Sequence, residues 1–137
     1  MDFVVDASIA MGWLLQSQAN SVTVAAENAL DRNIGWVPSY FGIEVARTLR
    51  SHERRGLISA EMVEKAIARL RDLPLKQDAD ETLNRLATIV ALARLRTLRV
   101  ADSAYLELGL RLGLPLATRD ASLVRAAKEA GVPLFSA

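Results

Sequence analysis

Four acidic residues lie at points where predicted strands run into predicted helices, and such a set can bind a divalent cation. Asp6 and Asp120 each follow a short apolar run, whereas Glu44 and Asp102 each lie near the start of a predicted helix. In an open parallel sheet, the carboxyl ends of the strands and the adjacent helix starts share one rim, where ligands bind. Four carboxylates on one rim would repel each other without a cation between them. A metal-dependent site is therefore the leading hypothesis.

Each acid also has a purely structural explanation, which is favoured when the acid is considered alone. Asp6 and Asp120 are suitable helix N-caps, and Asp102 would complement a helix dipole from the first turn. Glu44 could pair with Arg47 on an exposed helix face. The joint pattern favours the metal site, because three of the acids stand in largely apolar surroundings and a buried carboxylate needs a partner.

The ligand types indicate which class of ion would bind. Carboxylate oxygens are hard ligands, and the chain has no Cys and one His, so Mg²⁺ or Mn²⁺ is favoured over Zn²⁺. Ser8 and Thr118 each lie two residues from an acid, and their hydroxyls could orient a carboxylate or bind phosphate. Helix capping by Ser8 and ordinary strand propensity for Thr118 are equally good explanations. His52 lies mid-helix, away from the acids, and is predicted to be structural.

The composition bounds the fold and the compartment. The chain has 137 residues and is 51% hydrophobic, which suits one folded domain, 1–137, rather than a disordered chain. The absence of Cys excludes disulfides and a thiol nucleophile and fits a cytoplasmic protein. No basic N-terminal region is present, so no signal peptide is expected, and no apolar run approaches the ~20 residues of a membrane span.

The pattern of apolar runs and helix signals predicts an α/β fold with a mainly parallel sheet. Short buried strands are predicted at 2–5, 36–37, 75–76, 114–117 and 132–135. Helices are predicted at 8–15, 22–33, 40–55, 59–72, 80–95, 102–112 and 122–130. Because the strands alternate with helices, right-handed crossovers should place helices on both faces of the sheet. The four acids would then lie at one edge of that sheet.

Four segments in this order resemble the PIN domain, and specifically the VapC-type toxin ribonucleases. The N-terminal Phe3-Val4-Val5-Asp6-Ala7-Ser8 is similar to the family's first strand and first acid, and Ile43-Glu44-Val45 matches its second acid. Asp102-Ser103-Ala104-Tyr105-Leu106-Glu107-Leu108 resembles the helix start with the third acid. Leu114-Pro115-Leu116-Ala117-Thr118-Arg119-Asp120 resembles the strand before the fourth. The resemblance covers nearly the whole chain.

The resemblance implies a three-layer α/β/α sandwich with a mainly parallel five-stranded sheet. It also implies an Mg²⁺- or Mn²⁺-dependent endoribonuclease, in which the cation is held by the catalytic acids Asp6, Glu44, Asp102 and Asp120. A homodimer and inhibition by a cognate antitoxin protein are further expectations. The chain departs from the family pattern in having Ala101 before the third acid, Arg47 in place of an Asn, and Ala121 after the fourth acid.

Arginines near the acids are candidate contacts for the RNA backbone. Of the 17 basic residues 14 are Arg, whose planar fork matches phosphate oxygens, although the net charge is only +1. Arg47 could contact phosphate or pair with Glu44, and pairing is favoured. The other candidates lie beyond Glu44 on its helix or before Asp102, and they are Arg50, Arg54, Arg55, Arg94, Arg96 and Arg99. Solvated helix ends are an equally good explanation for several of them.

Two other functions are considered alongside the nuclease. A catalytically inactive PIN-fold module that binds RNA or protein is the alternative, and the presence of all four acids disfavours it. A Mg²⁺-dependent phosphatase or phospho-acceptor domain is disfavoured because Asp6-Ala7-Ser8 lacks the second Asp of the phosphatase motif. The phospho-acceptor type also needs a Lys after the last strand, and the sequence has none there.

Overall fold

A parallel sheet forms the centre of the molecule. The computed structural model describes residues 1–79 and 82–136. Within these residues the sheet has four strands in the order β3-β2-β1-β4, and all three pairings are parallel. The strands are β1 (Phe3–Val5), β2 (Gly35–Val37), β3 (Leu75–Gln77) and β4 (Leu116–Ala117). The predicted alternation of strands and helices is confirmed.

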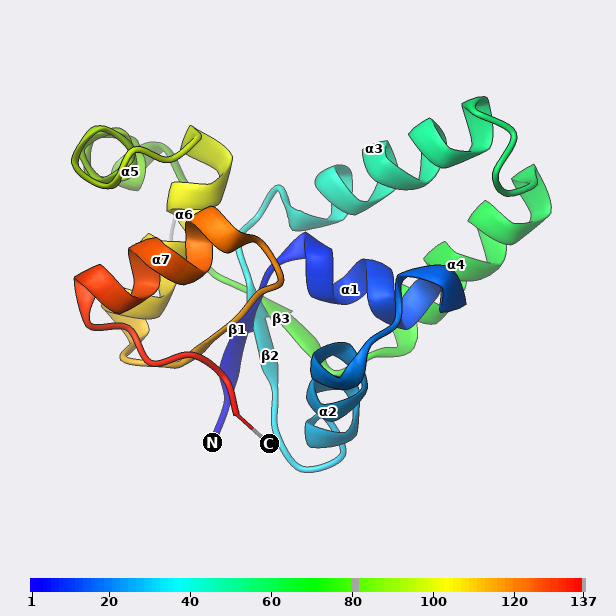
Figure 1. Ribbon diagram of the computed structural model, residues 1–137, viewed down its shortest axis with the longest axis horizontal. Coiled ribbons are helices and arrows are strands. Elements are labelled where there is room, and N and C mark those ends of the chain that lie inside the picture. Colours follow the sequence, from blue (N-terminus) through cyan, green and yellow to red (C-terminus); the bar gives the residue numbers. More distant parts are fainter. Residues whose placement is uncertain (80–81, 137) are drawn as a thin grey trace.

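Seven α-helices and one short 3-10 helix connect and cover the strands in the described part of the chain. Figure 1 shows α6 and α7 on one side of the sheet and α1, α2 and α4 on the other. The helices are α1 (Ala7–Leu14), η1 (Gln16–Gln18), α2 (Ser21–Ala29), α3 (Phe41–Arg54), α4 (Ala60–Asp72), α5 (Thr82–Arg96), α6 (Val100–Leu112) and α7 (Ala121–Ala130). The predicted start of α5 at Asp80 lies outside the described residues.

The prediction of a fifth strand at 132–135 is wrong. The structure has only an isolated parallel bridge between Leu116 and Leu134, with two hydrogen bonds, from the Leu116 N–H to the Pro133 carbonyl and from the Phe135 N–H to the Leu116 carbonyl. Two features prevent a longer ladder. Strand β4 is only two residues long, and Pro133 has no N–H to donate.

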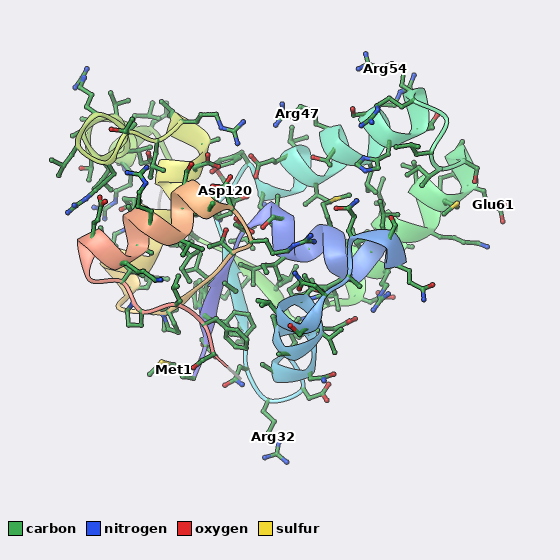
Figure 2. The ribbon with its side chains drawn as sticks, viewed as in Figure 1. Met1, Arg32, Arg47, Arg54, Glu61 and Asp120 are labelled. Carbon is green, nitrogen blue, oxygen red and sulfur yellow. The ribbon has the colours of Figure 1, made fainter. Side chains whose placement is uncertain are left out.

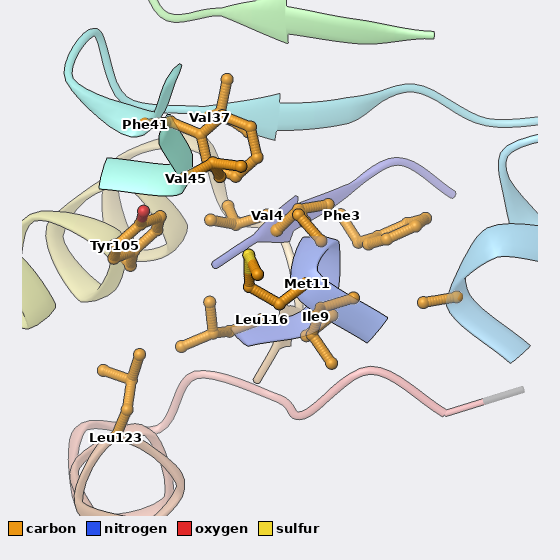
Figure 3. Close-up of a cluster of buried hydrophobic side chains, with 14 of the residues drawn as sticks. Phe3, Val4, Ile9, Met11, Val37, Phe41, Val45, Tyr105, Leu116 and Leu123 are labelled. Atoms are coloured by element: carbon orange, nitrogen blue, oxygen red, sulfur yellow. The ribbon is translucent and has the colours of Figure 1, made fainter. Parts of the chain in front are cut away.

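The hydrophobic core lies around the central strand β1. All three residues of β1 are fully buried, because β1 pairs on both edges and is covered on both faces. This explains why the strand is a continuous apolar run and does not alternate with polar residues. Figure 3 shows Phe3 and Val4 of β1 packed among side chains of α1, β2 and β4. Burial is weakest at the edge of the sheet formed by β3, which is largely exposed.

No helix in the described residues combines the length and the apolar character that a membrane span requires.

The close contact between α1 and α2 depends on Gly12. A Cβ added to Gly12 would lie 2.3 Å from Cγ2 of Thr23. Thr23 is fully buried and is fixed by a capping box with Asn20 at the start of α2. We expect Gly12→Ala to lower the free energy of unfolding by about 1–3 kcal/mol, because overpacking forces the helices apart. Thermal unfolding measures the effect.

Gly42→Ala is the matched control for this substitution. Gly42 is also helical, but a Cβ there would meet nothing within 4 Å, so Ala should be neutral or stabilising through its higher helix propensity. Equal melting temperatures for the two variants would contradict the packing explanation.

Candidate active site

All four predicted acids line one cavity of about 510 Å³. Asp6 directly follows β1, Glu44 lies in the first turn of α3, Asp102 lies in the first turn of α6, and Asp120 caps α7. Figure 2 shows Asp120 at the start of α7, on the side of the molecule where α3 begins. The topology therefore brings together four carboxylates that are distant in sequence.

Asp6 is the most buried of the four acids. Its side chain is 5% exposed, and it caps α1 by accepting a hydrogen bond from the Ile9 N–H at 3.2 Å. Burial raises the pKa of Asp6 to about 6, although hydrogen bonds from Ser8, Thr118 and the α1 backbone oppose this shift. Asp6 is thus a carboxylate whose ionised form is poorly solvated and would be stabilised by a nearby cation.

Two hydroxyl groups connect Asp6 to the loop between β4 and α7. The Ser8 hydroxyl donates to Asp6 Oδ1 at 2.5 Å and accepts from the Arg119 N–H at 3.0 Å. The Thr118 hydroxyl donates to Asp6 Oδ2 and accepts from the Asp120 N–H at 3.0 Å. Each hydroxyl therefore orients the carboxylate and also fixes the backbone beside Asp120.

Thr118→Val is expected to destabilise the protein by about 1–3 kcal/mol, because it leaves a buried carboxylate oxygen and a backbone N–H without their hydroxyl partner. Thr118→Ser keeps the hydroxyl and is the control. Urea unfolding at pH 7.5, where Asp6 is ionised, measures both variants. A Val variant as stable as the Ser variant would show that the Thr118 hydroxyl does not hold this loop.

Tyr105 is a site residue that the analysis of the sequence did not select. It is buried on α6, it lines the cavity, and its hydroxyl donates to Glu44 Oε1 at 2.5 Å. Burial and the neighbouring Tyr40 and Glu44 raise the pKa of Tyr105 far above its usual value, so the phenol stays protonated and remains a donor. The available signal was its spacing, because Tyr105 lies one helical turn after Asp102 and therefore on the same helix face.

Tyr40 supports Tyr105 from the loop before α3. The two rings meet edge to face with centroids 5.8 Å apart, and the Tyr40 hydroxyl donates to the carbonyl of Ala101. This bond connects the start of α3 to the start of α6, the two elements that present Glu44 and Asp102. Tyr40 therefore helps to hold Glu44 and Asp102 close to each other.

Three arginines line the cavity, and two of them, Arg47 and Arg99, were predicted as RNA contacts. Arg47 lines the cavity, as do Arg99 and Arg119. Arg99 donates to Asp102 Oδ2 at 3.1 Å. The favoured pairing of Arg47 with Glu44 is not found, since within residues 1–79 and 82–136 Glu44 instead accepts from Tyr105 and has no ion pair with Arg47.

The other predicted RNA contacts lie away from the acids. Arg50 pairs with Glu53 at 3.3 Å, and Arg96 pairs with Glu129 at 3.8 Å. Arg54 lies at the far end of α3 in Figure 2, and Arg94 is exposed on α5. As far as the described residues define it, the lining of the cavity includes none of these four arginines.

The carboxylate oxygens of the cavity suit a hard divalent cation, but the side chains are not arranged to coordinate one. In the parts of the chain that the structure describes, no group of three or more His, Cys, Asp or Glu side chains stands close enough to hold an ion. Glu44 is engaged by Tyr105 and Asp102 by Arg99. The carboxylates would have to move closer together before their oxygens could share one ion.

Comparisons with known proteins relate the chain to ribonucleases. It is similar to Ribonuclease VapC3 from two strains of Mycobacterium tuberculosis, with 34% identity over 125 residues, which span 90% of this chain and 85% of the relative. Its structure is similar to the crystal structure of PAE2754 from Pyrobaculum aerophilum, with a TM-score of 0.70, 17% identity, and coverage of 92% of this chain and 79% of that one. No family model matches the chain. At such low identity the structural likeness concerns the fold alone.

Proposed function

Because the chain belongs to the VapC family of PIN-domain ribonucleases, we propose that it is a Mg²⁺- or Mn²⁺-dependent endoribonuclease that hydrolyses RNA phosphodiester bonds. The main support is that four carboxylates from four separate elements line a single cavity. We further propose that the chain is the toxin of a toxin–antitoxin pair.

The four acids fit a divalent cation by chemistry and by environment. All offer carboxylate oxygens, the ligands that Mg²⁺ and Mn²⁺ prefer. The cost of keeping Asp6 ionised while it is 5% exposed would be relieved by a cation. Asp6, Glu44 and Asp102 would hold the ion, and Asp120 would complete the acidic pocket. When bound, the ion lowers the pKa of water and offsets negative charge on the phosphate oxygens.

Side chains in and next to the cavity position these acids. Ser8 and Thr118 hold both oxygens of Asp6, so its carboxylate keeps one orientation. Tyr105 donates to one oxygen of Glu44 and leaves the second oxygen for another partner. Asp102 would give up its contact with Arg99 to bind the ion. Because Arg99 is 80% exposed, releasing it to solvent costs little.

Cleavage of total RNA by the purified protein tests this proposal. Reactions contain Mg²⁺, Mn²⁺ or EDTA, and Glu44→Gln is purified in parallel as a control for contaminating nucleases. Gln keeps an oxygen that can accept from Tyr105, so the variant should fold. We expect discrete products only with a divalent ion and only from the wild-type protein. Products in EDTA, or equal products from Glu44→Gln, would refute the proposal.

A homodimer and an antitoxin partner are part of the same proposal and are tested separately. The toxin assignment predicts that the small protein encoded beside this gene binds the chain and inhibits RNA cleavage in a stoichiometric manner. Light scattering coupled to size-exclusion chromatography measures the mass of the chain alone and of the mixture. A monomer would overturn the dimer, and a neighbouring protein that neither binds nor inhibits would overturn the toxin assignment.

One observation favours the alternative of an inactive module that binds RNA or protein. As the side chains stand, the described acids do not form a cluster ready to receive an ion. Calorimetric titration with Mn²⁺ separates the two functions, because the nuclease requires saturable binding that Asp6→Asn abolishes. RNA binding without metal binding would support the inactive module.

A further inference from the structure

Arg119 is fixed at both its backbone and its guanidinium group. Its N–H donates to the Ser8 hydroxyl at 3.0 Å, and Ser8 in turn donates to Asp6. Its Nη1 donates to the carbonyl of Gln18 at the end of η1. Both Arg119 and Gln18 line the cavity. The exposed guanidinium is therefore held beside the acids, although it comes from a loop.

The guanidinium of Arg119 keeps free donors after this anchoring. An Arg side chain has five N–H donors in a planar fork, and the Gln18 carbonyl engages only Nη1. The edge formed by Nε and Nη2 is left for an oxyanion, which Arg binds through two parallel hydrogen bonds. Within the described residues Arg119 has no ion pair, in contrast to Arg99, which donates to Asp102.

The anchoring also distinguishes Arg119 from Arg47. Arg47 is the other arginine of the cavity that forms no ion pair within the residues described. Immobilising a long side chain on binding costs about 0.5–1.5 kcal/mol, and preorganisation avoids this cost. Arg119 is already held by Gln18, whereas no comparable bond from the Arg47 guanidinium is found among these residues. Arg119 is thus the better prepared of the two to bind an anion in a fixed place.

The charge balance of the cavity favours an anion once a cation is present. Four carboxylates and three guanidinium groups line it, so the fully ionised cavity has one net negative charge. One divalent ion changes this to one net positive charge. A phosphodiester would therefore be attracted more strongly when the ion is bound. Arg119 is the arginine of the cavity whose guanidinium is held in place by a hydrogen bond to the backbone of another element.

We propose that Arg119 is a substrate-positioning residue whose anchored guanidinium binds an RNA backbone phosphate beside the bond that is cut. The inference rests on the proposed nuclease function and adds a specific contact to it. Arg119 would hold the strand in register with the acids, and it would bind every RNA sequence alike because it contacts phosphate and not base edges.

The test compares Arg119→Ala, Arg119→Lys and Arg32→Ala. Arg32 is exposed and lies at the opposite end of the molecule from Arg47 and Asp120 in Figure 2, so Arg32→Ala removes the same charge far from the cavity. Steady-state cleavage of a short single-stranded RNA in Mg²⁺ yields kcat and KM. Fluorescence anisotropy of a labelled copy of this RNA, with each substitution placed in an Asp102→Asn background, yields Kd against salt.

For Arg119→Ala we expect KM to rise roughly tenfold or more with kcat nearly unchanged, as on loss of a charge-assisted contact made equally in ground and transition states. The slope of log Kd against log salt should fall by about 0.7, the value for one phosphate contact on a single strand. Arg119→Lys should recover the salt slope but only part of KM, because it keeps the charge and loses the fork. Arg32→Ala should match the wild type.

The inference is overturned if Arg119→Ala matches Arg32→Ala in both KM and salt slope, or if kcat falls while KM is unchanged. A fall in melting temperature for Arg119→Ala with wild-type binding would show a purely structural role and would also overturn it. Failure of the wild-type protein to cleave RNA concerns the proposed function instead. In that case the anisotropy data still decide whether Arg119 binds the RNA backbone.

Discussion

Replacing Asp102 with Asn is expected to abolish metal-dependent RNA cleavage while the protein stays folded. The substitution removes a negative charge from the cavity that all four acids share and keeps the shape of the side chain. Stabilisation of transition-state charge by a bound ion is worth several kcal/mol, and about 1.4 kcal/mol corresponds to a factor of ten in rate. We therefore expect kcat/KM to fall by at least roughly 10³-fold.

The fold should tolerate this substitution because the ion pair it removes is weak. The partner Arg99 is 80% exposed, and exposed pairs of this kind contribute ~0–1 kcal/mol. Asp31→Asn is the matched control, since Asp31 is exposed in the turn after α2 and loses the same charge. Initial rates on a defined RNA and melting temperatures are measured for both variants. An Asp102→Asn variant with activity within a few-fold of the wild type would show that Asp102 is not an active-site residue.

Replacing Asp6 with Asn is expected to stabilise the metal-free protein at neutral pH. Burial raises the pKa of Asp6 from 3.8 to about 6, and one pKa unit corresponds to about 1.4 kcal/mol, so keeping Asp6 ionised costs on the order of 3 kcal/mol. Asn removes this cost and is as good an N-cap for α1 as Asp. The variant should be more stable in EDTA at pH 7.5, and it should be inactive.

The pH dependence of this effect has a definite sign. Between pH 3.8 and about 6, the folded protein binds a proton at Asp6 that the unfolded chain has already lost. The contribution of Asp6 to stability therefore declines as pH rises through this window. The advantage of Asp6→Asn should be absent near pH 4, grow up to about pH 6, and stay level above it.

Chemical unfolding at pH 4, 6 and 7.5, in EDTA and then with Mg²⁺, measures this prediction. Adding Mg²⁺ should stabilise the wild type and leave Asp6→Asn unchanged, because a ligand that binds only the folded state stabilises by mass action. A variant that is less stable than the wild type at pH 7.5 in EDTA would show that the hydrogen bonds to the ionised carboxylate outweigh the cost of burying it.

Local signals in the sequence predicted most of the fold. The run Phe3-Val4-Val5 is apolar on both faces and becomes the central strand β1. Asp6 and Asp120 were predicted as N-caps, and each accepts a hydrogen bond from the backbone three residues later. These features depend on interactions within a few residues, so the sequence indicates them without knowledge of the packing. The prediction of a fifth strand failed because its pairing depends on the length of a strand distant in sequence, β4.

The four acids could also be predicted, because the carboxyl ends of parallel strands and the helix starts beside them meet at one rim whatever the details of packing. The partners of these acids could be predicted only in part, since the Ser8 and Thr118 hydroxyls were candidates to orient a carboxylate but Tyr105 was not selected. Tyr105 meets Glu44 across 61 positions, and Thr118 meets Asp6 across 112. Each contact depends on which side of its element faces the cavity and on how closely the elements approach.

Which arginines lie at the cavity also could be predicted only in part from the sequence alone. Proximity in sequence favoured Arg50 and Arg54 on α3 and Arg94 and Arg96 on α5, yet none of these four is among the described residues that line the cavity. Arg119 lines the cavity because the β4–α7 loop is held against α1 by Ser8 and Thr118. The sequence by itself determined the order of the elements and the ligand chemistry, which depend on residue type and local spacing. Only the tertiary structure decided which side chains surround the acids, because the orientation of each helix and loop is set by packing against distant parts of the chain.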